Sequence, residues 1–264
     1  MYQNILTEVG GGVGIVTLNR PERHNAFDEA LIEELTTAVA AMADDPAVRV
    51  LVLSGTGKSF CAGADLNWMK RAAAYSPEES VADARALAEM LRALAQVGKP
   101  TVARVHGAAL GGGVGLVAAC DIAIATYDAQ FALSEVRLGI IPAVISPHVI
   151  NAIGERAARR YMLSAERFAA AEAYRIGLVH EIVPDQAALD EAVGEIVGAL
   201  LGNGPEALAR CKELIRAVAW RPLSASVIED TAQRIAMIRR TDEAREGMDA
   251  FLEKRQPSWA LKTD

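Results

Sequence analysis

The chain has 264 residues, with 27 Lys and Arg against 34 Asp and Glu, so its formal net charge is −7. This acidic balance argues against nucleic acid as the main partner, because a surface that follows phosphates needs an excess of Lys and Arg. Hydrophobic residues make up 52% of the chain and aromatic residues only 5%, so a core must consist largely of Ala, Val, Leu and Ile. The length suffices for one large domain or for a domain with an appendage.

Cysteine spacing and terminal sequence bear on the compartment. Cys61, Cys120 and Cys211 lack the spacing of a zinc site or a redox pair, so we expect no metal and interpret them as buried small hydrophobic residues in a reducing compartment. The first four residues, MYQN, do not begin a secretory signal. The longest uncharged apolar stretch, 108–120, has 13 residues, whereas a membrane helix needs roughly 20. We therefore predict a cytoplasmic protein without a membrane partner.

Strands and helices alternate in the first half of the chain. The glycines of 10–12 join two short predicted strands, 5–9 and 13–19, which is typical of a hairpin. Asp28 opens a helix whose apolar residues recur at helical spacing. Residues 48–53 are almost continuously apolar, which indicates a strand buried on both faces.

A second set of elements repeats this order. A helix is predicted over 77–97, followed by a strand over 101–105, the triple glycine 111–113 with an apolar helix, and a strand over 122–126. Strand, glycine turn and helix thus occur twice. This recurrence predicts a layered α/β structure with helices packed on sheets.

Helical patterns dominate after Pro142. They run from about 146 to 253, and only 178–183 looks extended. From about Pro205 the pattern is entirely helical. It has more apolar residues than an isolated helical tail could bury by itself. We therefore divide the chain into a core, 1–204, and a helical region, 205–264, that covers either another subunit or its own core.

Two loops place glycine and small residues directly after buried strands. They are SFCAGADL at 59–66 and HGAALGGG at 106–113. Backbone N–H groups at a strand-to-helix turn are good donors to a developing oxyanion, and small side chains let a ligand approach them. For either loop alone, glycines that merely permit a tight turn are an equally good interpretation.

Four ordered motifs give these loops a more specific meaning. They are FCAGADL at 60–66, GAALGGG at 107–113, CDIAIA at 120–125 and FALSEVRLGIIP at 131–142. With these motifs the sequence resembles the enoyl-CoA hydratase/isomerase family, the crotonase superfamily. The resemblance implies an α/β fold, a crotonase-like spiral of ββα units followed by a C-terminal helical trimerisation region.

The resemblance also implies a site. In this family the oxyanion hole uses two backbone amides, which here are those of Ala64 and Gly112, and they would polarise a thioester carbonyl. Coenzyme A is part of the substrate, and no further cofactor is expected. The residues implied in substrate and CoA binding are Arg23, Ala26, Ala62, Asp65, Leu66, Trp68 and Pro142. Because CoA is polyanionic and the chain is acidic, we expect local positive charge at Arg23 and Lys58.

One carboxylate stands out. The family's hydratases commonly use two glutamates, but the first position is Gly115 here and only the second is retained, as Glu135. Its apolar neighbours should favour its neutral form and tune it for proton transfer. The alternative is a strand-end carboxylate paired with a neighbour such as Arg137.

A narrower resemblance concerns the substrate. Residues 134–168 resemble the branch that hydrates 3-methylglutaconyl-CoA or isohexenylglutaconyl-CoA, in leucine and acyclic-terpene breakdown. Such acyl groups carry a second carboxylate or a branched chain, so Lys70, Arg71 and Arg137 are candidate cations, while Trp68 and Met69 are candidate pocket walls. His106 and His148 have no obvious partner, and we leave them outside the catalytic set.

Three other functions are compatible with parts of this pattern. A Δ3-Δ2-enoyl-CoA isomerase needs only one carboxylate to move a proton between carbons. A dinucleotide-binding protein would match the GVGLVA of 113–118, although the expected acidic residue does not end the following strand. A scaffold or RNA-binding relative conflicts with the acidic charge. We predict an enoyl-CoA hydratase that forms a homotrimer or a dimer of trimers.

Overall fold

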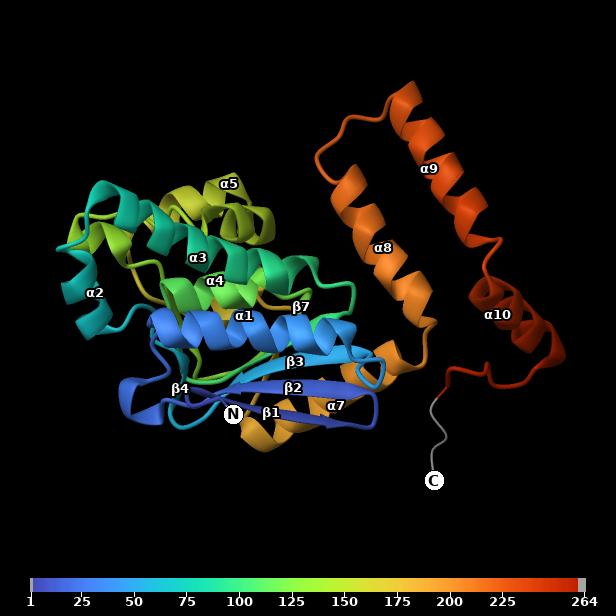
Figure 1. The fold of residues 1–264 in the computed structure, drawn as a ribbon, viewed down its shortest axis with the longest axis horizontal. Coiled ribbons are helices and arrows are strands. Elements are labelled where there is room, and N and C mark those ends of the chain that lie inside the picture. The colour runs from blue at the N-terminus through green and yellow to red at the C-terminus, as the bar shows by residue number, and fades with distance from the viewer. Residues whose placement is uncertain (1, 261–264) are drawn as a thin grey trace.

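A computed structural model describes residues 2–260 and shows a core built on sheets, with a helical arm projecting from it (Figure 1). The main sheet has six strands in the order β1-β2-β3-β5-β7-β10. Their bounds are β1 (Ile5–Gly10), β2 (Val13–Leu18), β3 (Val50–Gly55), β5 (Thr101–Val105), β7 (Ile122–Thr126) and β10 (Glu181–Val183). The predicted hairpin forms the antiparallel pair β1–β2, and the remaining neighbours pair in parallel.

A second sheet, which the sequence did not predict, lies partly in the two glycine-containing loops and partly in the stretch after 146 that was expected to be helical. Its strands are β4 (Ser59–Cys61), β6 (Ala108–Leu110), β8 (Gln130–Ala132) and β9 (Phe168–Ala169), in that spatial order. Strands of two or three residues are too short to show an alternating pattern, which explains why they were missed. Each of β3, β5 and β7 is followed by one strand of this small sheet and then by helical structure. The predicted spiral of ββα units is therefore confirmed.

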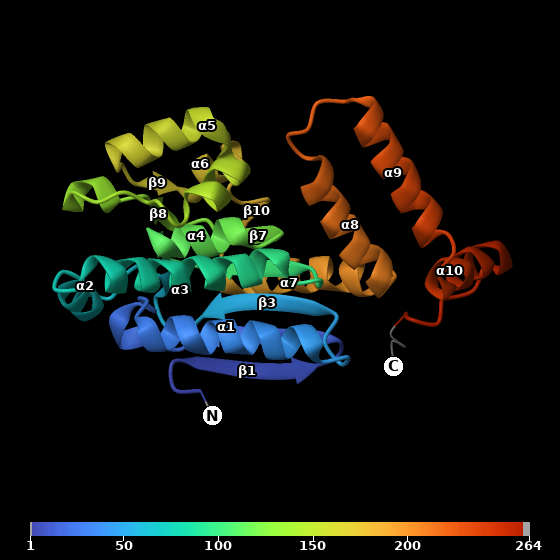
Figure 2. The same cartoon turned by 45° about the horizontal axis from the view of Figure 1, so that its top comes forward.

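Helices cover both faces of the main sheet. On one face α1 (Glu29–Asp44) and α3 (Pro77–Gln96) lie side by side, and on the other α7 (Gln186–Leu201) packs against β3, β5 and β7 (Figures 1 and 2). The side chain of Asp28 caps α1 by accepting the N–H of Leu31 at 3.0 Å, as the sequence predicted. The other helical elements of the core are η1 (Pro21–Arg23), α2 (Leu66–Ala72), α4 (Gly112–Ala119), η2 (Glu135–Leu138), α5 (Ser146–Ser164) and α6 (Ala170–Arg175).

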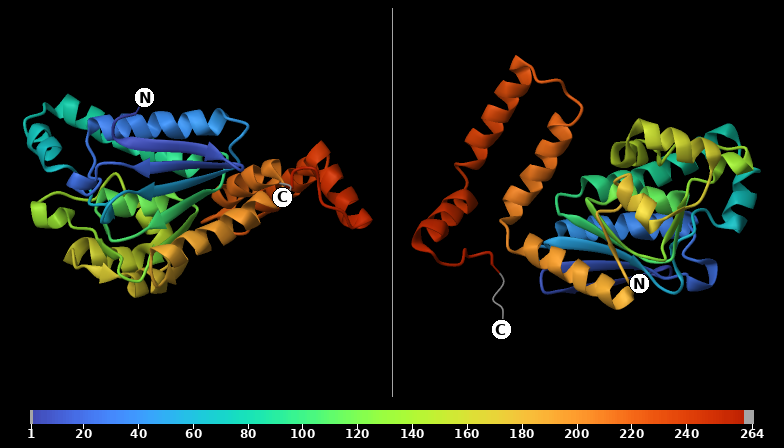
Figure 3. Two further views of the ribbon diagram at one scale, coloured as in Figure 1. Left: turned by 90° about the horizontal axis from the view of Figure 1, so that it is seen from below. Right: turned by 180° about the vertical axis from the view of Figure 1, so that it is seen from behind.

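The C-terminal helices form the arm. They are α8 (Pro205–Val218), α9 (Ala225–Ile238) and α10 (Asp242–Glu253), and all three stand away from the sheets in every view (Figures 1 and 3). The arm is tied to the core at its base, where Nζ of Lys212 lies 2.6 Å from a carboxylate oxygen of Asp121. It does not cover its own core, so that option of the prediction is wrong.

Large apolar side chains of the arm are exposed to solvent in the single chain. Trp220 is 79% exposed and Phe251 is 83% exposed. Cys211 is exposed as well, so the prediction that all three cysteines are buried is wrong for it, and Cys120 is only partly buried. Burial raises the pKa of the Cys61 thiol to about 12. No helix within residues 2–260 combines the length and apolar character needed to cross a bilayer.

Candidate active site

The two glycine-containing loops meet at the carboxyl ends of their strands. Gly63 has a φ of +89°, and a Cβ added there would lie 2.8 Å from the carbonyl oxygen of Leu110 and 3.7 Å from the amide nitrogen of Gly112. A side chain at this position would therefore be strained and would collide with the second loop. Glycine at 63 lets the segment that carries Ala64 lie directly beside the segment that carries Gly112.

The amides of Ala64 and Gly112 are both free to donate. Ala64 forms a parallel bridge with Phe27, in which its neighbours Gly63 and Asp65 make both hydrogen bonds, each 2.7 Å long. This pattern turns the N–H of Ala64 to the opposite side. Gly112 begins α4, where N–H groups have no partner inside the helix. Within residues 2–260 neither amide has an acceptor, so two unpaired donors lie together at one place.

Glu135 lies beside this pair of amides. It begins η2, and its Oε1 would be 3.2 Å from a Cβ added at Gly111, the residue before Gly112. Its Oε2 is buried and has no hydrogen-bond partner among the described residues. Burial raises the pKa of Glu135, and its own backbone N–H opposes that shift. Among residues 2–260 no ion pair joins it to Arg137, so the structure does not support the alternative of a salt-bridged surface carboxylate.

Comparisons with known proteins identify the family of the chain. The family model described as "Enoyl-CoA hydratase/isomerase" matches residues 8–262. The chain belongs to the enoyl-CoA hydratase/isomerase family. A putative enoyl-CoA hydratase of Thermus thermophilus is 36% identical over 94% of this chain and 97% of its own, and a crotonyl-CoA hydratase of Syntrophomonas wolfei is 34% identical over 99% of both. The crystal structure of an enoyl-CoA hydratase from Shewanella pealeana superimposes with a TM-score of 0.95, at 43% identity over 98% of this chain and 97% of that one.

The fold of this family also argues against the dinucleotide-binding alternative. The strands of the main sheet follow one another in chain order, from β1 at one edge to β10 at the other. Doubly wound dinucleotide-binding sheets bind their ligand where the strand order reverses. The described sheet has no such reversal, so the GVGLVA segment at 113–118 serves the crotonase fold, within α4.

Asp65 has a structural function that the sequence analysis did not foresee. It caps α2 by accepting the N–H groups of Asn67 at 2.7 Å and Trp68 at 3.2 Å, and it pairs with Arg23 at 2.7 Å and Arg20 at 3.4 Å. Burial acts to raise the pKa of Asp65, but the hydrogen bonds from Arg23 and the two amides outweigh it and hold the pKa below its ordinary value. The carboxylate of Asp65 is therefore engaged within the protein. These contacts hold Asp65, and with it the backbone next to Ala64, in place.

We expect Asp65→Ala to lower the free energy of unfolding by about 2–4 kcal/mol, because it removes a helix cap and leaves buried Arg20 with fewer partners. Asp65→Asn can still cap the helix but carries no charge, so its free energy of unfolding should fall by less. Urea unfolding of the two variants measures both values. Equal losses would mean that the cap contributes nothing.

The other predicted CoA contacts are arranged around this cluster. Arg23 keeps 44% of its side chain exposed although it pairs with Asp65, and Leu66 is exposed. The carbonyl of buried Ala26 accepts a hydrogen bond from Arg20 at 2.7 Å, and the N–H of Ala62 donates to His24 at 2.9 Å. The Ala26 carbonyl and the Ala62 N–H are therefore already hydrogen-bonded within the protein, so they are less available to bind a ligand.

Lys58 lies on a loop that packs against η1. A Cβ added at Gly57 would be 2.7 Å from the Cβ of Pro21, the first residue of η1. Lys58 itself is exposed. The structure thus brings the loop of Lys58 close to the element that carries Arg23, as the expected cluster of positive charge requires.

Trp68 is buried, and its indole N–H donates to Asp83 at 3.0 Å. Sequence reasoning missed Asp83, because nothing in the pattern of α3 links it to a residue fifteen positions earlier. Arg71, one of the three candidate cations, pairs with Glu29 at 2.5 Å. Lys70 and Arg137 are exposed and have no ion pair within residues 2–260, while Met69 and Pro142 are partly buried.

Neither histidine considered earlier joins the site. Nε2 of buried His106 lies 3.0 Å from the carbonyl oxygen of Gly57, and its Nδ1 has no partner among the described residues. Burial is the largest cause that lowers its pKa. Burial alone lowers the pKa of His148 in α5. Both shifts favour the neutral imidazole, and within residues 2–260 neither ring forms a hydrogen bond with Glu135 or with the amides of Ala64 and Gly112.

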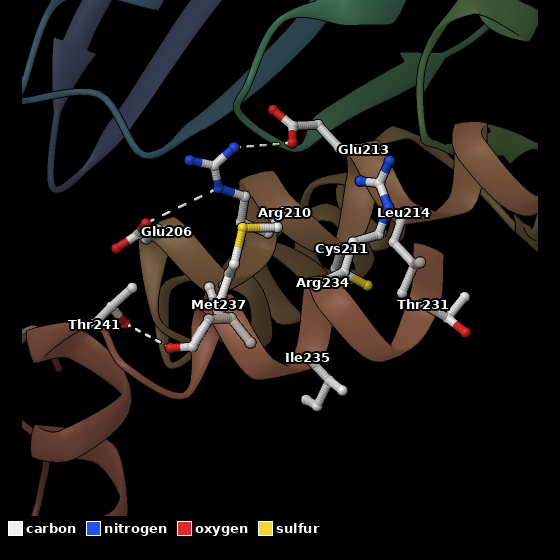
Figure 4. Close-up of a pocket in the computed structure, with 12 residues that line it drawn as sticks. Glu206, Arg210, Cys211, Glu213, Leu214, Thr231, Arg234, Ile235, Met237 and Thr241 are labelled. Carbon is white, nitrogen blue, oxygen red and sulfur yellow. Dashed lines mark hydrogen bonds and ion pairs between the residues drawn. The ribbon is translucent and has the colours of Figure 1, made fainter. Parts of the chain in front are cut away.

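An apolar groove lies in the arm, away from the loops that carry the Ala64 and Gly112 amides. It runs between α8 and α9 in the arm, where side chains from both helices face it (Figure 4). Its lining residues include Arg210, Cys211, Leu214, Ile235 and Met237. The groove shares no residue with the two amides or with Glu135.

The environment of Glu135 has a consequence for stability. A carboxyl whose pKa is raised on folding binds more protons in the folded state than in the unfolded state, so stability decreases as pH rises through its folded pKa. We expect Glu135→Gln to unfold at the same temperature as the parent protein or at a higher one at pH 7, and the difference should shrink below about pH 4. Thermal melts at the two pH values measure it. A variant that is less stable at pH 7 would show that the charged form is stabilised.

Proposed function

We propose that the chain hydrates a 2-enoyl-CoA thioester, with the Ala64 and Gly112 amides as the oxyanion hole and Glu135 as the acid and base. The observation that supports this most is the buried Oε2 of Glu135, which lies beside two backbone amides and, like them, has no partner within residues 2–260. An unpaired buried polar group has a free-energy cost, and a substrate that pairs all three would remove it. The named activity of the Syntrophomonas relative points the same way.

The proposed reaction adds the elements of water across the double bond. One oxygen of ionised Glu135 takes a proton from water as the water oxygen bonds to C3. The electron pair of the double bond moves toward the thioester, and charge develops on its carbonyl oxygen. Fixed N–H donors at that oxygen typically contribute about 2.7–4 kcal/mol each. Glu135 then delivers the proton to C2, which regenerates the carboxylate and completes the 3-hydroxyacyl product.

The substrate we propose is a branched or dicarboxylic enoyl-CoA such as 3-methylglutaconyl-CoA. The sequence of 134–168 and Gly115 in place of a first glutamate support this choice. Arg137 and Lys70 are exposed, have no ion pair within residues 2–260, and are the cations we propose for a second carboxylate. Arg23 and Lys58 would meet the phosphates of CoA. The proposed reaction needs no cofactor beyond the CoA of the substrate. The cytoplasmic location stays a prediction.

A second candidate reaction is Δ3-Δ2-enoyl-CoA isomerisation, which the single carboxylate equally allows. Loss of the ultraviolet absorbance of the enoyl thioester, measured with crotonyl-CoA, 3-methylcrotonyl-CoA and 3-methylglutaconyl-CoA, tests hydration. A 3-enoyl-CoA substrate in the same assay tests isomerisation. Hydration of the branched substrates at the highest kcat/KM supports the proposal, whereas isomerisation without any hydration contradicts it.

We also propose that the arm joins copies of the chain into a homotrimer or a dimer of trimers. The exposed apolar side chains of α9 and α10 support this, because a monomer rarely leaves such a surface in water. Ile235→Asp, at the groove between α8 and α9, should lower the mass measured by light scattering, and Glu229→Gln on the same helix should not. A parent protein that stays monomeric at micromolar concentration would contradict the proposal.

A further inference from the structure

A buried side chain fills the space beside Gly115. Gly115 of α4 donates its N–H to the carbonyl of Gly111, the residue that precedes the helix, at 3.2 Å. A Cβ added at Gly115 would lie 2.4 Å from Cγ2 and 2.9 Å from Cβ of Ile145. Contacts this short do not occur between real atoms. Any side chain at 115 therefore requires Ile145 to move.

Ile145 has little freedom to do so. It is 3% exposed, it precedes the first turn of α5, and its β-branched side chain has few rotamers. Leu91 of α3 also borders this position, since its Cδ1 would be 3.7 Å from the added Cβ. Two buried apolar residues thus close the position at which a second carboxylate would have to enter.

This apolar wall and Glu135 face the same short segment of backbone. The added Cβ of Gly111 meets Oε1 of Glu135, that of Gly115 meets Ile145, and the hydrogen bond from Gly115 to Gly111 links the two positions. No neighbouring charged side chain contributes to the pKa shift of Glu135 within the described chain. His148, in the first turn of α5, forms no ion pair there either. The surroundings of Glu135 on this side are therefore apolar rather than charged.

We propose that Ile145 is a positioning and specificity-determining residue, an apolar plug paired with Gly115 that excludes a second carboxylate and keeps Glu135 out of water. This inference rests on the proposed function. It adds that a substituent on C3 of the substrate meets a hydrocarbon wall here, which suits a 3-alkyl enoyl-CoA. A smaller side chain at 145 should admit water to Glu135 and weaken the preference for branched substrates.

The first test is the pH dependence of kcat/KM in Ile145→Ala. Water that enters the vacated space would stabilise ionised Glu135, so the midpoint of the acid limb should move to lower pH, and the preference for 3-methylcrotonyl-CoA over crotonyl-CoA should fall several-fold. Ile5→Ala is the matched control, because Ile5 is 2% exposed and lies in the edge strand β1. It should lower Tm without moving the midpoint. An unchanged midpoint in Ile145→Ala would overturn the proposal.

The second test needs no activity and so remains valid if the proposed reaction is wrong. Gly115→Ala alone should lower Tm by several degrees, because its methyl group collides with Ile145. In the Ile145→Ala background the same change should be nearly neutral, so the two effects should be strongly non-additive. Equal losses of Tm in both backgrounds would show that Ile145 does not limit the space at 115.

Discussion

Glu135→Gln should lower kcat for hydration by about 10²–10⁴-fold, because an amide can neither accept the proton of water nor return one to carbon. The substitution keeps the size of the side chain, so KM should change little. Steady-state kinetics with a 2-enoyl-CoA measure both constants. The prediction has the largest effect of the set, because Glu135 is the carboxylate that the structure places beside the two free amides.

A matched control makes this result specific. Glu155→Gln removes the same charge from the exposed face of α5, where Glu155 pairs with Arg159. It should leave kcat and KM unchanged. Since Glu135→Gln should not destabilise the fold at pH 7, its lost activity cannot be attributed to unfolding. Activity within a few-fold of the parent protein would remove Glu135 from the mechanism.

Ala64→Pro should lower kcat by about 10²–10³-fold, because proline removes one of the two N–H donors to the oxyanion. The N–H of Ala64 has no acceptor within residues 2–260, so its loss breaks no hydrogen bond of the folded chain there. The effect should therefore appear in kcat more than in Tm. Kinetics and thermal melting of the same preparation separate the two.

Ala64→Gly is the control for this prediction. It keeps the N–H and removes only the methyl group of an exposed residue. It should retain kcat within a few-fold. If Ala64→Pro is as active as Ala64→Gly, the amide of Ala64 does not stabilise the transition state.

Much of the core could be predicted from sequence because its signals are local. Asp28 marks the start of α1, and continuous apolar residues mark β3, although the strand begins at Val50 rather than at 48. The two glycine loops are recognisable in the sequence as a source of backbone donors. Their meeting at Gly63 depends on contacts between segments about fifty residues apart, which no local pattern encodes.

The parts that sequence reasoning missed are those set by long-range pairing. The small sheet is made of strands too short to alternate, and Asp65 is structural because Arg20, Arg23 and the start of α2 converge on it. The acidic net charge gives no hint that two arginines surround one buried carboxylate beside the site. Likewise, Gly115 signals an absent glutamate, but only the fold shows that Ile145 fills the space.

The central claim is that Glu135 alone accepts the proton of water and delivers it to C2 as water adds to an enoyl thioester. Turnover of 3-methylglutaconyl-CoA in ¹⁸O-labelled water, followed by mass spectrometry of the product, tests it most directly. The account predicts one labelled hydroxyl group per product with the parent protein and almost none with Glu135→Gln over the same time. Labelling by Glu135→Gln at the parent rate, or an unlabelled isomerised product from the parent, would contradict it.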